Sequence, residues 1–273
     1  MTSANYIAAF LGSLSVAAGT VCSLNNDSAT SCILHPAVVM VTERLQDDTA
    51  AAVADTLAIG PFSAADTLEG SFPKGWRPMT FRGIRNTKYR LTSSEGTMVI
   101  RADAERSSSG LIYQQDIDLT EYPVIEWSWR IENALENGDV TQKSGDDYAA
   151  RIYVIFDYEL SNLPWGQRNM IRALRTFYGQ VPARAINYIH ATNAEPGLIT
   201  PNPYSDLVTM VVVDSGINNL GQWRSFRRNI YEDYLMIYEE PPPTVRGVAI
   251  MTDSDDTGET VTAFFGDIRF LAE

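Results

Sequence analysis

Several residue types and motifs are scarce in this 273-residue chain, and each scarcity argues against a class of protein. There are two cysteines and two histidines, and His35 lies far from His190, so the sequence holds no cluster suited to zinc. Basic residues number 21 against 34 acidic ones, and the net charge of −13 argues against nucleic acid, whose phosphates need a basic surface. The sequence also lacks a nucleophile elbow, a metalloprotease helix, a P-loop and a dinucleotide fingerprint.

The amino-terminal segment has the features of a targeting sequence. Residues 6–21 form an uncharged run rich in alanine, leucine, glycine and serine, and polar residues 22–27 follow. This length suits the core of a signal peptide better than a membrane span, which needs about 20 apolar residues. No lysine or arginine stands in residues 1–5. We expect export to the periplasm or beyond the cell, with an uncleaved membrane anchor as the alternative, and no other membrane contact.

Both cysteines, Cys22 and Cys32, precede the expected domain. In an oxidising compartment they can close a small disulfide loop, and free thiols are the alternative. Residues 37–57 have helical spacing of apolar side chains, and Gly60-Pro61 ends that pattern. We therefore divide the chain into an export or anchor segment, linker and helix over 1–60 and a main domain over 61–273.

The main domain is patterned as short strands separated by turns. Residues 124–132 place Ile125, Trp127, Trp129 and Ile131 on one face and charged side chains on the other. Strands of this length and spacing predict a mainly β protein, an antiparallel, jelly-roll-like β-sandwich rather than a parallel α/β sheet. A hairpin is expected around residues 93–96. Two helical insertions, 162–178 and 223–240, carry arginines at helical spacing.

One candidate ligand surface is the polar face of two strands that we expect to pair, residues 124–132 and the strand beginning at Arg151. A sandwich leaves one face of each sheet for solvent or ligand, and arginines with carboxylates there can fix sugar hydroxyls. The alternative is a ladder of cross-strand ion pairs that needs no ligand. The candidate residues are Glu126, Arg130, Arg151, Tyr153 and Asp157.

A second candidate is an acidic turn over residues 253–259. It begins like a calcium loop, with oxygen ligands around a glycine, so Asp253, Asp255 and Glu259 are candidate calcium ligands. Phe264 stands where the closing acid of such a loop would be, and a hydrated acidic turn without metal is the alternative. The neighbouring pair Asp146-Asp147 is either a pair of working carboxylates or part of a turn.

The motifs taken together resemble a known family. They are Trp127-x-Trp129-Arg130, Gly145-Asp146-Asp147-Tyr148-Ala149-Ala150-Arg151, Pro201-Asn202-Pro203-Tyr204, Leu220-Gly221-Gln222-Trp223, Met251-Thr252-Asp253 and Gly266-Asp267-Ile268-Arg269-Phe270. Over residues 62–270 the chain resembles exported bacterial proteins grouped as domain of unknown function 3047. The resemblance implies export and this domain, but no activity. The ending at residues 265–270 also resembles the last strand of jelly-roll carbohydrate-binding modules.

Two functions of different classes remain open on the sequence. The first, which we favour, is an exported non-catalytic binding or accessory module that recognises a glycan or a protein partner in the cell envelope. The second is a polysaccharide-cleaving enzyme that uses paired carboxylates drawn from Glu126, Asp146, Asp147 and Asp157. It requires two carboxyl groups that face each other across a cleft.

Overall fold

The computed structural model describes residues 55–65, 72–159, 161, 165 and 184–272. The expected export segment, Cys22, Cys32 and, apart from Trp165, the first helical insertion lie outside these residues. The main compact unit is Ala52–Glu273. Among the described residues, none of the helices combines the length and the apolar character that crossing a bilayer requires.

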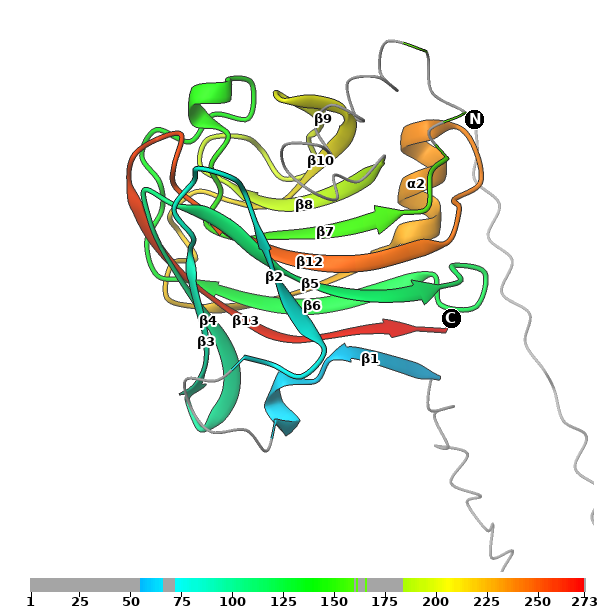
Figure 1. Ribbon diagram of the computed structural model, residues 1–273, viewed down its shortest axis with the longest axis horizontal. Coiled ribbons are helices and arrows are strands. Elements are labelled where there is room, and N and C mark those ends of the chain that lie inside the picture. Colours follow the sequence, from blue (N-terminus) through cyan, green and yellow to red (C-terminus); the bar gives the residue numbers. More distant parts are fainter. Residues whose placement is uncertain (1–54, 66–71, 160, 162–164, 166–183, 273) are drawn as a thin grey trace, which may run out of the picture. The chain divides into compact units, whose positions relative to one another are not determined.

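Two β-sheets pack face to face and form a sandwich (Figure 1). Sheet A has the order β11-β6-β13-β4-β3, and β1 pairs with β13 beyond this path. Its strands are β1 (Thr56–Gly60), β3 (Lys88–Ser94), β4 (Thr97–Glu105), β6 (Val124–Ile131), β11 (Trp223–Asn229) and β13 (Thr260–Leu271).

Sheet B has the order β2-β5-β12-β7-β8-β10-β9. Its strands are β2 (Trp76–Thr80), β5 (Ser108–Ile117), β7 (Arg151–Phe156), β8 (Ala185–Ala191), β9 (Ile199–Asn202), β10 (Ser205–Ser215) and β12 (Val245–Asp253). The pair β8 and β10 is parallel, and the other described pairs in both sheets are antiparallel. The expected mainly β sandwich is therefore confirmed, with one parallel pair inside it.

The core lies between the inner faces of the two sheets. Along β6 the side chains of Ile125, Trp127, Trp129 and Ile131 are buried, as their alternation predicts. The Trp127 ring reaches across to Tyr188 on β8, with 5.3 Å between ring centroids, and joins the two sheets. Burying an aromatic side chain of this size contributes roughly 1.5–3 kcal/mol, so this layer carries much of the stability.

The hairpin between β3 and β4 is confirmed, and its turn follows from two residues. Ser94 pairs with Thr97, which leaves Glu95 and Gly96 as a two-residue loop. Both have positive φ, 53° at Glu95 and 82° at Gly96. A two-residue turn with positive φ at both positions matches the right-handed twist of the flanking strands, so it holds the hairpin register.

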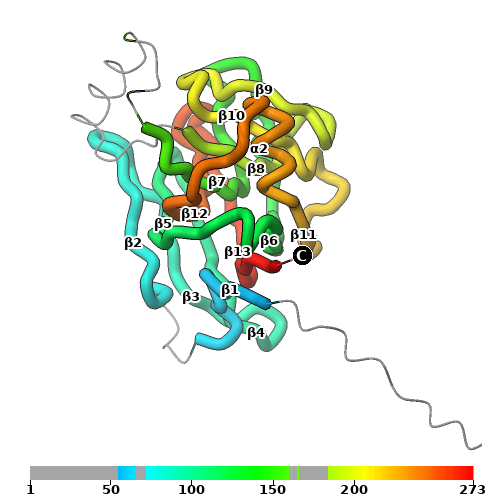
Figure 2. The backbone as a smooth tube through the Cα atoms, turned by 90° about the vertical axis from the view of Figure 1, so that its right-hand side faces the viewer, coloured from blue at the N-terminus to red at the C-terminus, as the bar shows by residue number. Residues whose placement is uncertain are grey.

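The expected helix over residues 223–240 is wrong in its first part. Trp223–Asn229 is strand β11, paired with β6, and the Phe226 ring stacks on Trp127 at 5.4 Å. The helix α2 (Ile230–Tyr238) begins only after Asn229, whose side chain accepts a hydrogen bond from the Glu232 N–H. The packing of the half-buried Phe226 against the core decides the strand, and the helical spacing of the arginines is coincidental. Figure 2 shows α2 beside β8, where the Tyr238 hydroxyl donates to the Ala185 carbonyl.

The expected helix over residues 37–57 also differs at its end. Thr56–Gly60 is strand β1, and it pairs antiparallel with the last strand, β13. Ile59 on β1 is 1% exposed, so the burial of one apolar side chain on the sheet edge outweighs the helical spacing before it. Strand β1 therefore belongs to the same sheet as β13.

The buried histidine of β8 makes the stability of the fold depend on pH. Burial lowers the pKa of His190 below its ordinary value of 6.5, while the nearby Asp214 charge opposes that shift. The His190 Nε2 lies 3.0 Å from the Gly216 carbonyl oxygen. Because the unfolded chain takes up a proton near pH 6.5 and the folded chain only at lower pH, this contribution to stability is complete above 6.5 and is lost as the pH falls through the folded pKa.

We therefore expect His190→Gln, which cannot titrate, to flatten the loss of unfolding free energy between about pH 7.5 and 5.5, by up to about 1.4 kcal/mol for each unit of pKa shift. Urea denaturation of both proteins across that range measures the slope. If wild type and variant lose the same free energy over the range, His190 does not titrate as its burial implies.

Candidate functional site

The five candidate residues of the polar face do not form one surface. β6 belongs to sheet A and β7 to sheet B, and neither strand pairs with the other. The expected pairing of these strands is therefore wrong. Both strands alternate apolar and polar residues, and this pattern suggests a pair. The same pattern is expected of any strand with one buried face, so it does not identify the neighbouring strand.

On sheet A the charges form a ladder across neighbouring strands. Glu126 on β6 accepts hydrogen bonds from Arg227 of β11 at 3.0 Å and from Arg269 of β13 at 2.7 Å. Arg130 pairs with Glu95 at 3.1 Å, and its guanidinium lies 4.4 Å from the Phe264 ring centroid. Glu126 thus takes part in a ladder of cross-strand ion pairs, which was the alternative to a ligand surface.

The remaining candidates lie on sheet B. Asp157, just after β7, accepts a hydrogen bond from Arg246 at 2.7 Å, and Arg246 also pairs with Asp116. Tyr153 is adjacent to Arg151, which donates to its hydroxyl at 3.2 Å, and burial raises the pKa of that hydroxyl. Asp157 is in an exposed ion pair, whereas Tyr153 belongs to the surroundings of a buried arginine.

Arg151 is 2% exposed and sits in a set of buried partners. Its Nε donates to Asp253 Oδ1 at 2.9 Å, and its Nη2 forms an ion pair with the same carboxylate. Nη2 also donates to the Asp146 carbonyl at 2.8 Å, and the guanidinium lies 4.4 Å from the Tyr148 ring centroid. These contacts tie the start of β7 to the end of β12 and to the segment before β7.

The acidic turn after β12 meets the Asp146-Asp147 pair at the same end of sheet B. Asp147, Asp253 and Asp255 each place one carboxylate oxygen within 4.8 Å of the others. Burial raises the pKa of Asp255, and the charges of Asp147 and Asp256 raise it further. Burial also raises the pKa of Asp146, against the opposing effect of Arg151. The structure therefore brings two expected metal ligands together with Asp147, which the calcium-loop pattern does not contain.

Glu259, the third expected metal ligand, lies elsewhere. Its carboxylate accepts hydrogen bonds from the backbone N–H groups of Glu136, at 2.8 Å, and Asn137, at 2.9 Å. These bonds lower its pKa against the effect of desolvation, which is the largest influence and raises it. Glu259 holds the loop after β6 and is not among the three clustered acids.

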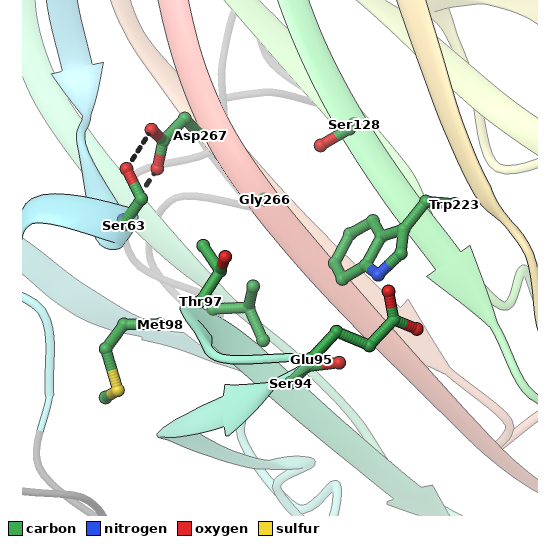
Figure 3. Close-up of a pocket in the computed structure, with 10 residues that line it drawn as sticks. Ser63, Ser94, Glu95, Thr97, Met98, Ser128, Trp223, Gly266 and Asp267 are labelled. Atoms are coloured by element: carbon green, nitrogen blue, oxygen red, sulfur yellow. Dashed lines mark hydrogen bonds between the residues drawn. The ribbon is translucent and has the colours of Figure 1, made fainter.

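The outer face of sheet A carries an open pocket of about 350 Å³ (Figure 3). The sequence did not single it out. Trp223 of β11 lies on one side of it, and Asp267 lies on the other beside Ser63, whose N–H and hydroxyl both donate to the Asp267 carboxylate. The lining residues are Ser63, Ser94, Glu95, Thr97, Met98, Val99, Ser128, Trp223, Gly266 and Asp267.

The strand register explains why Trp223 stands over this pocket. Trp223 pairs with Arg130 on β6, so it shares the outer face, whereas Phe226 pairs with Trp127 and points into the core. The register of β13 shifts between Phe265 and Ile268, around Gly266. A Cβ at Gly266 would overlap the Ser128 hydroxyl and lie 3.5 Å from the Trp223 ring. The glycine keeps the floor of the pocket open beneath the indole.

Comparison with known proteins gives a family and a set of structural similarities. Residues 74–269 match the model of a family described as "Protein of unknown function (DUF3047)", which confirms the family resemblance of the motifs. No curated protein matches the chain.

Solved structures with a similar fold share little sequence with the chain. The Emp47p carbohydrate recognition domain is 12% identical, with a TM-score of 0.42, over 80% of this chain and 94% of that one. A family 30 carbohydrate-binding module of a Clostridium thermocellum cellulase is 11% identical, with a TM-score of 0.36, over 80% and 98%. Endoglucanase 3 of Trichoderma harzianum, from family GH12, is 10% identical, with a TM-score of 0.39, over 81% and 99%. Identities this low say nothing of a ligand.

The buried ion pair gives a direct test of what holds this end of sheet B. Arg151→Met leaves the Asp253 carboxylate buried without its partner, so we expect a loss of roughly 3–5 kcal/mol in unfolding free energy. Arg246→Met removes an arginine that bridges exposed carboxylates, and we expect a loss of roughly 1 kcal/mol or less. Urea denaturation of the two variants at neutral pH makes the comparison, and equal losses would contradict the role given to Arg151.

Proposed function

The chain belongs to the DUF3047 family, and from that premise we propose that it is a glycan-binding module whose binding site is the pocket on the outer face of sheet A. The observation that carries the proposal is the position of Trp223 over an open pocket lined by both polar and apolar side chains. A pocket of about 350 Å³ has room for a small ligand such as a saccharide unit. A stable protein partner would instead need a contact surface of about 800 Å² on each side.

The size of the pocket suits a small polar ligand. Its volume of about 350 Å³ falls within the range of about 300–1,000 Å³ that is usual for small-molecule sites. The pocket is walled by the β3–β4 hairpin, β6, β11 and β13, all of which are paired within sheet A. Such walls are largely formed before a ligand arrives, which lowers the entropy lost on binding.

The chemistry of the lining combines an aromatic ring with hydrogen-bonding groups. The flat face of an indole offers apolar area to the C–H face of a sugar ring. The hydroxyls of Ser94, Thr97 and Ser128 can donate and accept, and the carboxylates of Glu95 and Asp267 accept. Sugar hydroxyls need both kinds of partner, so one ring stacked on Trp223 meets polar groups around its edge.

The enzyme alternative has no support from the four acids proposed for it. Glu126 is paired with Arg227 and Arg269, and Asp157 is paired with Arg246. Asp146 and Asp147 are 6% and 1% exposed. Two of the four are thus held in ion pairs and two are buried, whereas a glycosidase requires two carboxyl groups that reach the substrate from either side of a cleft.

The stacking role of Trp223 gives a test with a matched control. A glycan array with the wild-type protein identifies a saccharide, and isothermal titration calorimetry then measures its affinity. We expect Trp223→Ala to weaken binding roughly tenfold or more, because the stacked aromatic area is lost. Trp223→Phe keeps a ring on the same face and should retain most of the affinity.

Two outcomes would contradict the proposal. An array on which the folded wild-type protein binds no saccharide removes glycan recognition. Saccharide binding that Trp223→Ala leaves unchanged, with circular dichroism showing a folded variant, removes this pocket as the site.

The proposal includes export, with residues 6–21 as the targeting segment and the envelope as the place where glycans are met. To test export, the full chain including residues 1–60 is expressed in a Gram-negative host and the cells are fractionated. The amino-terminal residue of the recovered protein is then determined. We expect periplasmic protein that lacks the apolar run. Full-length protein in the membrane fraction would support the anchor, and full-length protein in the cytosol would contradict export.

A further inference from the structure

Two segments that are far apart in the sequence bring carboxylates together at the end of sheet B. Because β12 and β7 are antiparallel neighbours, with Met251 opposite Arg151, the segment before β7 lies beside the turn after β12. Asp147 comes from the first segment, and Asp253 and Asp255 come from the second. One oxygen of each lies within 4.8 Å of the other two.

An unpartnered oxygen on one of the three clustered acids points to a ligand. Asp147 is 1% exposed, and its Oδ2 accepts a hydrogen bond from the Thr257 N–H at 2.6 Å. Its Oδ1 is buried, and none of the described residues donates a hydrogen bond to it. A buried carboxylate oxygen without a partner is costly, so something that the protein itself does not supply is expected to satisfy it.

Two hydroxyl groups of the acidic turn are also buried without a hydrogen-bond partner. The Ser254 side chain is fully buried, and its Oγ has no hydrogen-bond partner among the described residues. The Thr257 Oγ1 is likewise buried and unpartnered. Orphaned oxygens thus occur within the turn that supplies two of the three carboxylates, independently of the acidic cluster itself.

Charge at this end of the sheet is far from balanced. Asp146 and Asp256 directly adjoin two of the clustered acids, Asp147 and Asp255, in the chain, so five carboxylates gather at this end of the sheet. In the described part of the chain, Arg151 alone forms ion pairs with members of this group, Asp146 and Asp253. Asp147 and Asp255 therefore lack a positive partner, which a divalent cation would provide.

We propose that Asp147, Asp253 and Asp255 bind one calcium ion, which joins the turn after β12 to the segment before β7. The donors are oxygens, which hard cations prefer, and no described histidine or cysteine takes part. Ca²⁺ tolerates irregular sets of carboxylates, hydroxyls, carbonyls and waters, whereas Mg²⁺ demands a regular octahedron. Asp147 supplies the additional carboxylate that a calcium loop would have at its closing position, where this chain has Phe264.

Calcium titration of the full chain, stripped with a chelator and dialysed, tests the proposal. Isothermal titration calorimetry with CaCl₂ should show one site, and thermal unfolding should shift to higher temperature as CaCl₂ is raised. Asp147→Asn should weaken calcium binding at least tenfold, and Asp255→Asn should do the same. Asp116→Asn, which changes an exposed aspartate paired with Arg246, is the matched control and should bind as wild type does.

Stability without calcium separates a metal site from an ordinary acidic turn. Removing one of the mutually repelling charges should raise the melting temperature of Asp147→Asn in chelator above that of wild type, while the calcium-dependent increase is lost. The proposal is overturned if wild type shows neither heat nor a thermal shift at millimolar CaCl₂. It is also overturned if Asp147→Asn and Asp255→Asn both bind calcium as tightly as wild type, or if MgCl₂ gives the same shift.

Discussion

The buried contact between Arg151 and Asp253 is the constraint on which this end of the molecule depends. A guanidinium that is 2% exposed requires compensation for its lost hydration, and the Asp253 carboxylate, the Asp146 carbonyl and the Tyr148 ring provide it. These partners come from β12 and from the segment before β7. Arg151 thereby fixes the relative position of the segments that carry the clustered acids, so the local geometry follows from one ion pair.

The sequence predicts the faces of strands well, because alternation is a local property. Trp127 and Trp129 share a face with isoleucines and are core residues, as expected. Strand neighbours cannot be obtained in this way, because pairing joins residues far apart in the chain. The assumed partnership of β6 and β7 failed for that reason, and the surface expected between Glu126 and Arg151 is divided between two sheets.

The same limit explains which site residues the sequence reached. Asp253 and Asp255 are neighbours in one turn, so a loop pattern finds them, whereas Asp147 joins them only through the pairing of β7 with β12. For Trp223, the helical spacing of the arginines that follow it predicts a helix. The pairs of Ser225 with Ser128 and Arg227 with Glu126 show that Trp223 begins a strand whose alternate residues face outward. Phe226, an aromatic between these polar residues, was the available signal.

The pocket and the acidic cluster belong to different sheets, although one segment of the chain connects them. The acidic turn leads directly into β13, which supplies Gly266 and Asp267 to the pocket. β13, however, is hydrogen-bonded to β4 from Thr260 to Phe265 and to β6 on its other edge. A strand held along both edges keeps its position whether or not the preceding turn is ordered. A cation at the turn should therefore act on the stability of sheet B and leave saccharide affinity at Trp223 unchanged, so each site can be tested without disturbing the other.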